Sequence, residues 1–156
     1  MGEMNLAEAT PFDIDALAAG PELDRLIAER VMGCKVAENF QGNPICGCNE
    51  HRPHNRWWNE AAGDLLTDYS ADIFAAWAVV EKVINADHDG ADYWFDLQII
   101  WRAFDENPVD YRPCIRVTFN KAGERGFSYG YFSYHGEADT VPLAICRAAL
   151  KAVEGK

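Results

Sequence analysis

The chain has 156 residues, 49% of them hydrophobic and 12% aromatic, which is enough for one domain with a core of its own. Asp and Glu outnumber Lys and Arg by 25 to 14, giving a formal net charge of −11, and the basic residues form no run. Proteins that grip duplex nucleic acid set clustered Lys and Arg against the phosphates, so this composition argues against duplex binding. Two or three arginines in a local pocket could still hold a small anion.

Five cysteines, an odd number, argue against a fully paired disulfide framework and suit a reducing compartment. No apolar run approaches the roughly 18 residues of a membrane span, and the first residues lack the pattern of a secretory signal. We therefore expect a cytoplasmic protein with no membrane partner. Residues 1–20 are small, acidic and punctuated by Gly and Pro, which predicts a weakly ordered leader before a single domain over 21–156.

The first half of that domain predicts two helices separated by a long irregular segment. Pro21 opens the first helix and Gly33 ends it. The apolar positions of this helix are Leu23, Leu26, Ile27 and Val31. Residues 34–68 are interrupted by Gly and Pro and predict a long loop insertion, of a kind that is functional, disordered or stapled. Ser70 is a good N-cap for the second helix. The apolar stripe expected there is Ile73, Trp77, Val80 and Ile84.

The second half predicts three strands and a last helix. Residues 93–101 alternate between apolar and polar positions, residues 115–119 do the same, and residues 127–134 are rich in aromatic side chains. Asn120 begins a hairpin turn, and Thr140 begins the last helix. Strands joined by short turns form an antiparallel meander, and the helices bury their stripes on it. We predict an α+β fold: an antiparallel sheet of three or slightly more strands packed with about three helices.

Three blocks of the sequence carry a resemblance to a known family. They are LDRLIAERVMGCK at 23–35, YSADIFAAWAVVEK at 69–82 and PLAICRAALKAV at 142–153. In this order and spacing they resemble the phage ABA sandwich domain, a family of small phage proteins. The resemblance implies a phage or prophage origin and a sheet sandwiched by helices, and it brings no established catalytic mechanism. The chain departs from the family pattern at Cys34, where an aromatic residue is common, and in its longer loop after the first block.

The Cys/His cluster in the loop is the best candidate metal site. Thiolates and imidazoles this close together are what a tetrahedral zinc site needs. Zinc would bind Cys46, Cys48, His51 and His54, with Cys34 as a substitute for one of them. Four protein ligands leave no open position for water, so the zinc would be structural. The ligand spacings are tighter than in the common Cys-x-x-Cys knuckle, and incidental Cys and His residues in a flexible loop are the alternative.

Two regions combine arginine with residues suited to a nucleotide. Arg56 and Trp57 follow the cluster, and a guanidinium beside an aromatic face suits a purine and its phosphates. The tryptophan could equally pin the loop to the domain or form a subunit contact. Arg116 lies on the second strand, on the face of Thr118, with Arg112 nearby. That face either meets water or forms a polar pocket in which Arg116 binds an anion.

Arg116 shares the polar face with candidate residues of the neighbouring strand, Asp96 and Gln98. Arg147, on the last helix, could reach a ligand or a partner, although it could also be an ordinary exposed helix arginine. The ligand-binding candidates are therefore Arg116, Arg112, Arg147, Trp57 and Arg56. A pocket in so short a chain is expected at a subunit interface, which predicts a homo-oligomer.

The sequence shows no nucleophile elbow and no phosphate-cradling loop, which favours a non-enzymatic protein. Some small phage proteins sequester the nucleotide signals of bacterial immunity. By analogy with them, the leading hypothesis is a phage accessory, anti-defence protein. It would bind a small nucleotide-like ligand such as a cyclic nucleotide immune signal, or block a host defence protein, in the host cytoplasm. The alternatives are a zinc-stabilised structural or protein-interaction module and a metal-dependent nucleotide hydrolase with Glu50 as its base.

Overall fold

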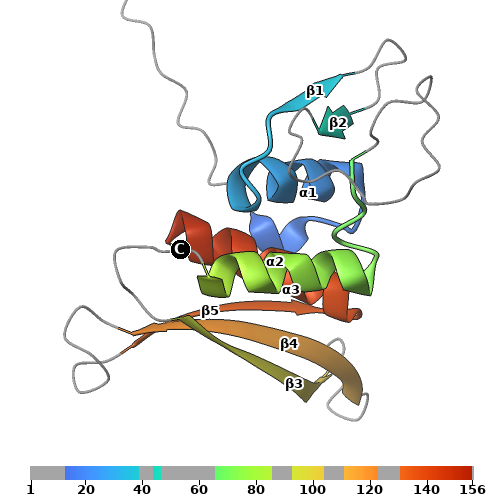
Figure 1. Cartoon of the computed structure of the whole chain (residues 1–156). Coiled ribbons are helices and arrows are strands. Elements are labelled where there is room, and N and C mark those ends of the chain that lie inside the picture. The colour runs from blue at the N-terminus through green and yellow to red at the C-terminus, as the bar shows by residue number, and fades with distance from the viewer. Residues whose placement is uncertain are drawn as a thin grey trace, which may run out of the picture.

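The computed structural model describes residues 13–38, 44–46, 66–85, 93–103, 111–122 and 131–155 (Figure 1). The helical elements are η1 (Ile14–Ala16), α1 (Pro21–Leu26), which continues as the π-helical turn η2 (Ile27–Val31), α2 (Ile73–Asn85) and α3 (Val141–Glu154). The strands are β1 (Val36–Glu38), β2 (Pro44–Cys46), β3 (Tyr93–Ala103), β4 (Tyr111–Ala122) and β5 (Tyr131–Ala138). None of the helices in these residues is long and apolar enough to cross a membrane.

Strands β3, β4 and β5 form an antiparallel sheet in that order, with each strand next to its neighbour in sequence. Together with the helices, this meander confirms the predicted α+β class. Strand β4 is the central strand, and its inward residues Val117 and Phe119 are fully buried. The third strand was predicted at 127–134, but the ladder with β4 continues to Ala138. Asn120 pairs with Ser133 within this ladder, so the prediction that it begins a turn was wrong.

Helices α2 and α3 both pack on the same face of this sheet (Figure 1). On the α2 side, the ring of Trp77 meets the ring of Phe95 at 5.5 Å, and Phe95 in turn contacts Phe119. On the α3 side, Gly136 of β5 lies directly beneath the helix backbone. In the described residues the layers therefore run α1, then α2 with α3, then the sheet, and the second face of the sheet carries no described helix.

The first helix forms as its pattern predicts. Pro21 stands at its first position, and Leu23 and Ile27 are fully buried. Gly33 ends it with a φ of 72°, a left-handed conformation that costs glycine little.

The start of α2 differs from the prediction. Asp72, not Ser70, is its N-cap, because the Asp72 carboxylate accepts hydrogen bonds from Phe74 N at 2.7 Å and Ala75 N at 3.3 Å. Ser70 is instead completely buried, and its hydroxyl accepts a hydrogen bond from Gly20 N at 2.9 Å. A capping role fits any Ser or Asp near a helix start, so the sequence pattern did not separate the two residues.

The buried stripe of α2 is also rotated from the predicted one. The residues that face the core are Ala76, Val79, Val80 and Val83. Of the predicted stripe only Val80 is buried, whereas Ile73, Trp77 and Ile84 are 36–47% exposed. The helix is apolar on both sides, and the small Ala and Val residues take the core side because they let α2 approach α3 closely.

Part of the segment before Pro21 packs against α3 and the core. Ile14 and Leu17 are buried, and Asp15 forms an ion pair with Lys151 of α3 at 2.7 Å. The segment 34–68, predicted to be irregular, contains a short antiparallel ladder of β1 with β2 that pairs Val36 with Cys46.

Candidate functional site

The face of the sheet opposite α2 and α3 carries a polar surface built by strand register. Residues opposite each other in an antiparallel ladder point to the same face. Three rows therefore cross β3, β4 and β5 in turn: Trp94, Asn120 and Ser133; Asp96, Thr118 and His135; Gln98, Arg116 and Glu137.

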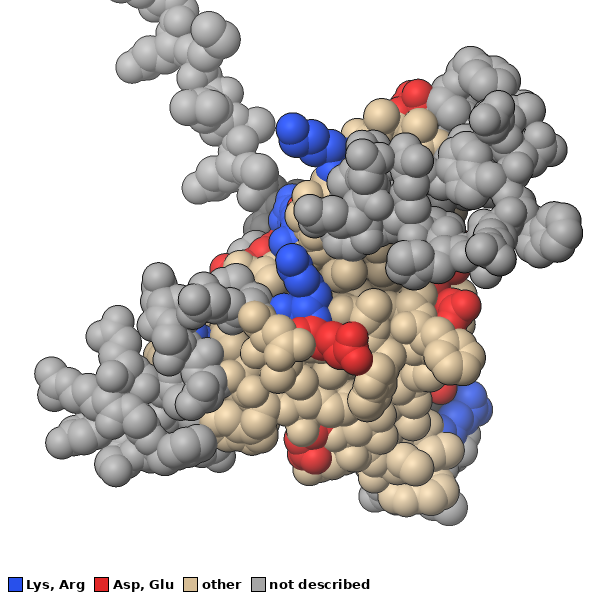
Figure 2. Space-filling model, viewed as in Figure 1, with Lys and Arg blue, Asp and Glu red and all other residues tan. Residues whose placement is uncertain are grey.

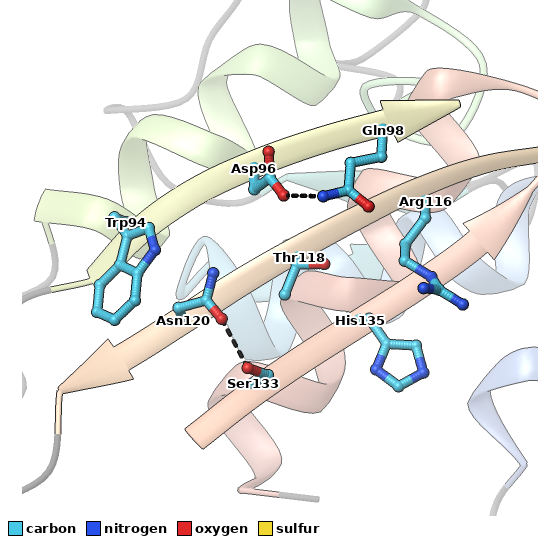
Figure 3. A pocket seen from close by; sticks show the side chains of 8 residues that line it. All are labelled: Trp94, Asp96, Gln98, Arg116, Thr118, Asn120, Ser133 and His135. Carbon is cyan, nitrogen blue, oxygen red and sulfur yellow. Dashed lines mark hydrogen bonds between the residues drawn. The ribbon is translucent and has the colours of Figure 1, made fainter. Parts of the chain in front are cut away.

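Eight of these nine residues, all except Glu137, line a hollow of about 400 Å³, which we call the sheet-face pocket (Figure 3). Trp94 stands at one end of the pocket and Arg116 at the other. They lie two rows apart, which corresponds to about 13 Å along a strand. The pocket therefore offers an aromatic face and a cation to opposite ends of one elongated ligand.

Hydrogen bonds along the pocket hold its amide groups in place. Gln98 donates its amide N–H to the Asp96 carboxylate at 2.6 Å, and the Ser133 hydroxyl donates to the Asn120 carbonyl at 2.6 Å. Each bond fixes one side chain against its neighbour and leaves further amide and carboxylate atoms to face the hollow. These groups are preorganised, so a ligand pays less entropy to order them.

A cluster of charges borders the Arg116 end of the pocket. The Arg116 guanidinium donates to Glu137 from Nε at 2.8 Å and approaches it from Nη2 at 2.6 Å, and Arg102 contacts the other oxygen of the same carboxylate. Burial alone would raise the pKa of Glu137, but the two arginines outweigh burial, so that pKa lies below its ordinary value. Glu137 therefore stays ionised and orients Arg116.

Arg112 and Arg147, two of the predicted ligand residues, lie outside the pocket. Arg112 is on the same face as Arg116 but pairs with Arg102, beyond the three rows. Arg147 donates to the carbonyl of Leu17 at 2.6 Å and to that of Glu137 at 2.6 Å, so its guanidinium joins α3 to two other segments. Of the predicted arginines that the structure describes, only Arg116 lines the pocket.

The predicted zinc ligands fall mostly outside the described residues. Cys48, His51 and His54 lie there, as do Arg56 and Trp57. Cys46 is placed only through its backbone, which pairs with Val36 in the β1–β2 ladder. Cys34 lies two residues before Val36 and is buried. The described residues contain no cluster of three or more metal-ligating side chains. The zinc site stays a prediction.

The thiols of α3 and β4 belong to the packing of the domain. Cys146 is fully buried, and burial raises the pKa of its thiol far above the ordinary value. Cys114 directs its thiol to the carbonyl of Ala138 at 3.5 Å. A buried protonated thiol is a poor nucleophile, so the role of Cys146 is packing.

Sequence reasoning named Arg116, Thr118, Asp96 and Gln98 as residues of this face but missed the rest of the pocket. Trp94 was missed even though it lies on the same face of β3 as Asp96. The residues missed on the other strands are Asn120, Ser133 and His135. The alternation along each strand shows which residues share a face, but the sequence does not show the register of β5 against β4.

In the described residues, the geometry defines a small α+β domain whose sheet has helices packed on one face and a polar pocket on the other. A family model, the phage ABA sandwich domain, matches residues 25–150, which is most of the chain. The protein belongs to the phage ABA sandwich domain family, and the resemblance drawn from three sequence blocks is confirmed. No curated protein and no solved structure matches the chain.

Proposed function

We propose that this phage protein binds a small nucleotide-like ligand in the sheet-face pocket and sequesters it unchanged in the host cytoplasm. The observation that carries the proposal is the pocket itself. An indole, two side-chain amides, a carboxylate and a guanidinium converge there on a sheet face without a described helix. The whole chain carries a net charge of −11, whereas this face holds three arginines (Arg102, Arg112 and Arg116) against two carboxylates (Asp96 and Glu137).

Each group suits one part of a nucleotide. A base stacked on the Trp94 ring gains about 1–3 kcal/mol. The carboxylate of Asp96 and the amides of Gln98 and Asn120 can accept from and donate to the polar edge of the base. Arg116 has five N–H donors. Glu137 engages those on Nε and Nη2, so Nη1 is left to meet a phosphate.

The arrangement suits binding better than acid–base chemistry. Asp96 and His135 are the titratable pair of the pocket, and they lie in one row on β3 and β5 with β4 between them. Two strand spacings separate them by about 10 Å at the backbone. Concerted acid–base catalysis needs the acid and the base each within hydrogen-bond reach of a reacting atom. A nucleotide that spans this row would meet Asp96 and His135 only at its two ends, which favours binding over catalysis.

Titration calorimetry of the full chain with purine mononucleotides and cyclic dinucleotides tests the proposal. We expect micromolar binding for at least one of them. Trp94→Ala should weaken this binding about tenfold or more through lost stacking. Arg116→Gln should weaken it by a similar factor through a lost charged hydrogen bond.

Arg25→Gln is the matched control, because Arg25 is an exposed arginine of α1 that pairs with Glu29 and lies far from the pocket. It makes the same change of charge and should leave the affinity unchanged. The ligand recovered after binding should have its original mass, and a converted product would favour the hydrolase instead. If none of the nucleotides binds at micromolar concentrations, the proposal fails, and a role in binding a host protein becomes the better explanation.

A further inference from the structure

A second surface of the molecule is apolar and exposed. It comprises six large side chains, which we call the α2–β3 surface: Ile73, Phe74, Trp77, Leu97, Ile99 and Trp101. The contact of Trp77 with Phe95 joins the helix to the strand, and the three β3 residues follow Phe95 on the same face of the sheet. Figure 2 shows mostly uncharged side chains over the sheet below α2, whereas acidic and basic side chains lie over part of the helix itself.

The size of this surface is that of an interface. The six side chains are 40–85% exposed. Since a large aromatic side chain covers about 150–250 Å², these fractions amount to roughly 700 Å² of apolar area. The largest apolar patch of an ordinary monomer is about 300–600 Å². A specific protein–protein interface covers about 800 Å² on each partner.

Strand β3 is also an edge strand of the described sheet. It is 11 residues long, and in the described sheet it pairs with β4 on one side only. Proteins block such edges with proline, bulges or inward-pointing charges. Strand β3 contains no proline, and its two charged residues, Asp96 and Arg102, point to the polar face. The apolar face of this edge is Phe95, Leu97, Ile99 and Trp101.

We propose that two copies of this chain associate through the α2–β3 surface, with their β3 strands paired antiparallel across a two-fold axis at Ile99. When β3 pairs antiparallel with its own copy, the two sheets form one sheet whose corresponding faces lie on the same side. The apolar faces of both copies therefore join beneath the two α2 helices. The register sets Leu97 opposite Trp101 of the second copy. On the other face it sets Asp96 opposite Arg102 of the second copy, so residues of unlike charge lie in one row, although Arg102 also contacts Glu137 of its own chain.

This assembly also adds a wall to the sheet-face pocket. Asp96 and Gln98 line the pocket from the edge strand. In the dimer, Arg102 and Ile100 of the second copy lie beside them. The association of the two copies does not depend on any ligand.

Light scattering on the full chain during size-exclusion chromatography tests the association. We expect a mass of about twice the 17.5 kDa of the chain. Ile99→Lys sets two ammonium groups against each other at the axis and should weaken dimerisation about 100-fold. Ile99 is 64% exposed in the single chain, so the variant should keep its circular dichroism spectrum.

Phe132→Lys is the matched control, because Phe132 is 62% exposed on β5, at the other edge of the sheet. It should remain dimeric. Ile99→Cys should form a disulfide-linked dimer under mild oxidation, and Phe132→Cys should not.

A monomeric wild-type chain would overturn the proposal. If β3 were protected from hydrogen exchange in that monomer, another segment of the same chain would be the one that covers the α2–β3 surface. A dimer that survives Ile99→Lys but dissociates with Phe132→Lys would place the interface at β5. Each of these outcomes is independent of whether a nucleotide binds.

Discussion

Asp24 and Ser70 show how a polar pair can have a tertiary role that local patterns do not reveal. Asp24 is 3% exposed, and its carboxylate accepts a hydrogen bond from Ser70 N at 2.7 Å, 46 residues away in the chain. The Ser70 hydroxyl in turn accepts from Gly20 N. The pair therefore ties the start of α1 to the segment that leads into α2. Sequence reasoning placed Ser70 at the cap of α2, but its contacts instead join distant segments of the chain.

The buried Asp24 carboxyl should make stability depend on pH. Burial raises its pKa above the ordinary value, and the hydrogen bonds from Ser70 offset only part of this rise. The folded chain then holds a proton that the unfolded chain has released, so the contribution of Asp24 to stability falls as pH rises from about 4 through the raised pKa. Asp24→Asn keeps the acceptor for Ser70 N but does not titrate.

We therefore expect the stability of Asp24→Asn, measured relative to the wild type, to increase with pH over this interval and to level off above it. Urea denaturation at a series of pH values measures the difference. Asp139→Asn, which makes the same change of residue at an exposed position, is the control. A difference that stays constant with pH would show that Asp24 titrates as an ordinary carboxyl.

At the scale of elements, the contact of α3 with β5 depends on one missing side chain. A Cβ at Gly136 would lie 2.4 Å from Ala144 O and 2.5 Å from Ala148 N. Both atoms belong to the backbone of α3, so no side chain can move aside. Gly136→Ala should lower the free energy of unfolding by about 1–3 kcal/mol or more, because the helix must lift from the sheet.

Thermal or urea unfolding followed by circular dichroism measures this loss. Thr140→Ala, at the exposed N-cap of α3, is the control for the same junction. The Thr140 side chain makes no capping hydrogen bond, so its removal should change stability by about 0.5 kcal/mol or less. An unchanged Gly136→Ala variant would mean that α3 is free to shift along β5.

The elements themselves follow from the sequence to different degrees. Alternation predicted β3 and β4, and helical spacing predicted α1 and α3, because each has one apolar side. Helix α2 is apolar on two sides, so its pattern fitted two orientations and the wrong one was chosen. Packing decided the orientation: Ala76 and Val79 take the core side, and the larger Trp77 lies over Phe95 at the edge of the sheet.

At the scale of the molecule, the sequence predicted the α+β class and the family, but only part of the site. The alternation of polar and apolar residues along β3 and β4 identified Arg116 and its neighbours. The completed pocket needs β5 in its correct register, and register depends on pairing between segments rather than on local pattern. For the same reason Arg147 could be recognised as an arginine on a helix but not as a link between distant segments.

Arg147 joins three parts of the molecule, and its removal separates a structural role from a ligand role. From α3, its guanidinium donates to Leu17 O in the N-terminal segment and to Glu137 O in β5. Arg147→Met leaves both carbonyls without these donors and should destabilise the fold by about 2–3 kcal/mol. Arg147→Lys keeps the charge but cannot fork between the two carbonyls, so it should recover only part of the loss.

Urea denaturation of both variants measures the stability, and calorimetry below the unfolding range measures nucleotide affinity. A Met variant of normal stability that no longer binds nucleotide would restore Arg147 as a ligand residue. The contacts instead predict a less stable protein in which the sheet-face pocket still binds.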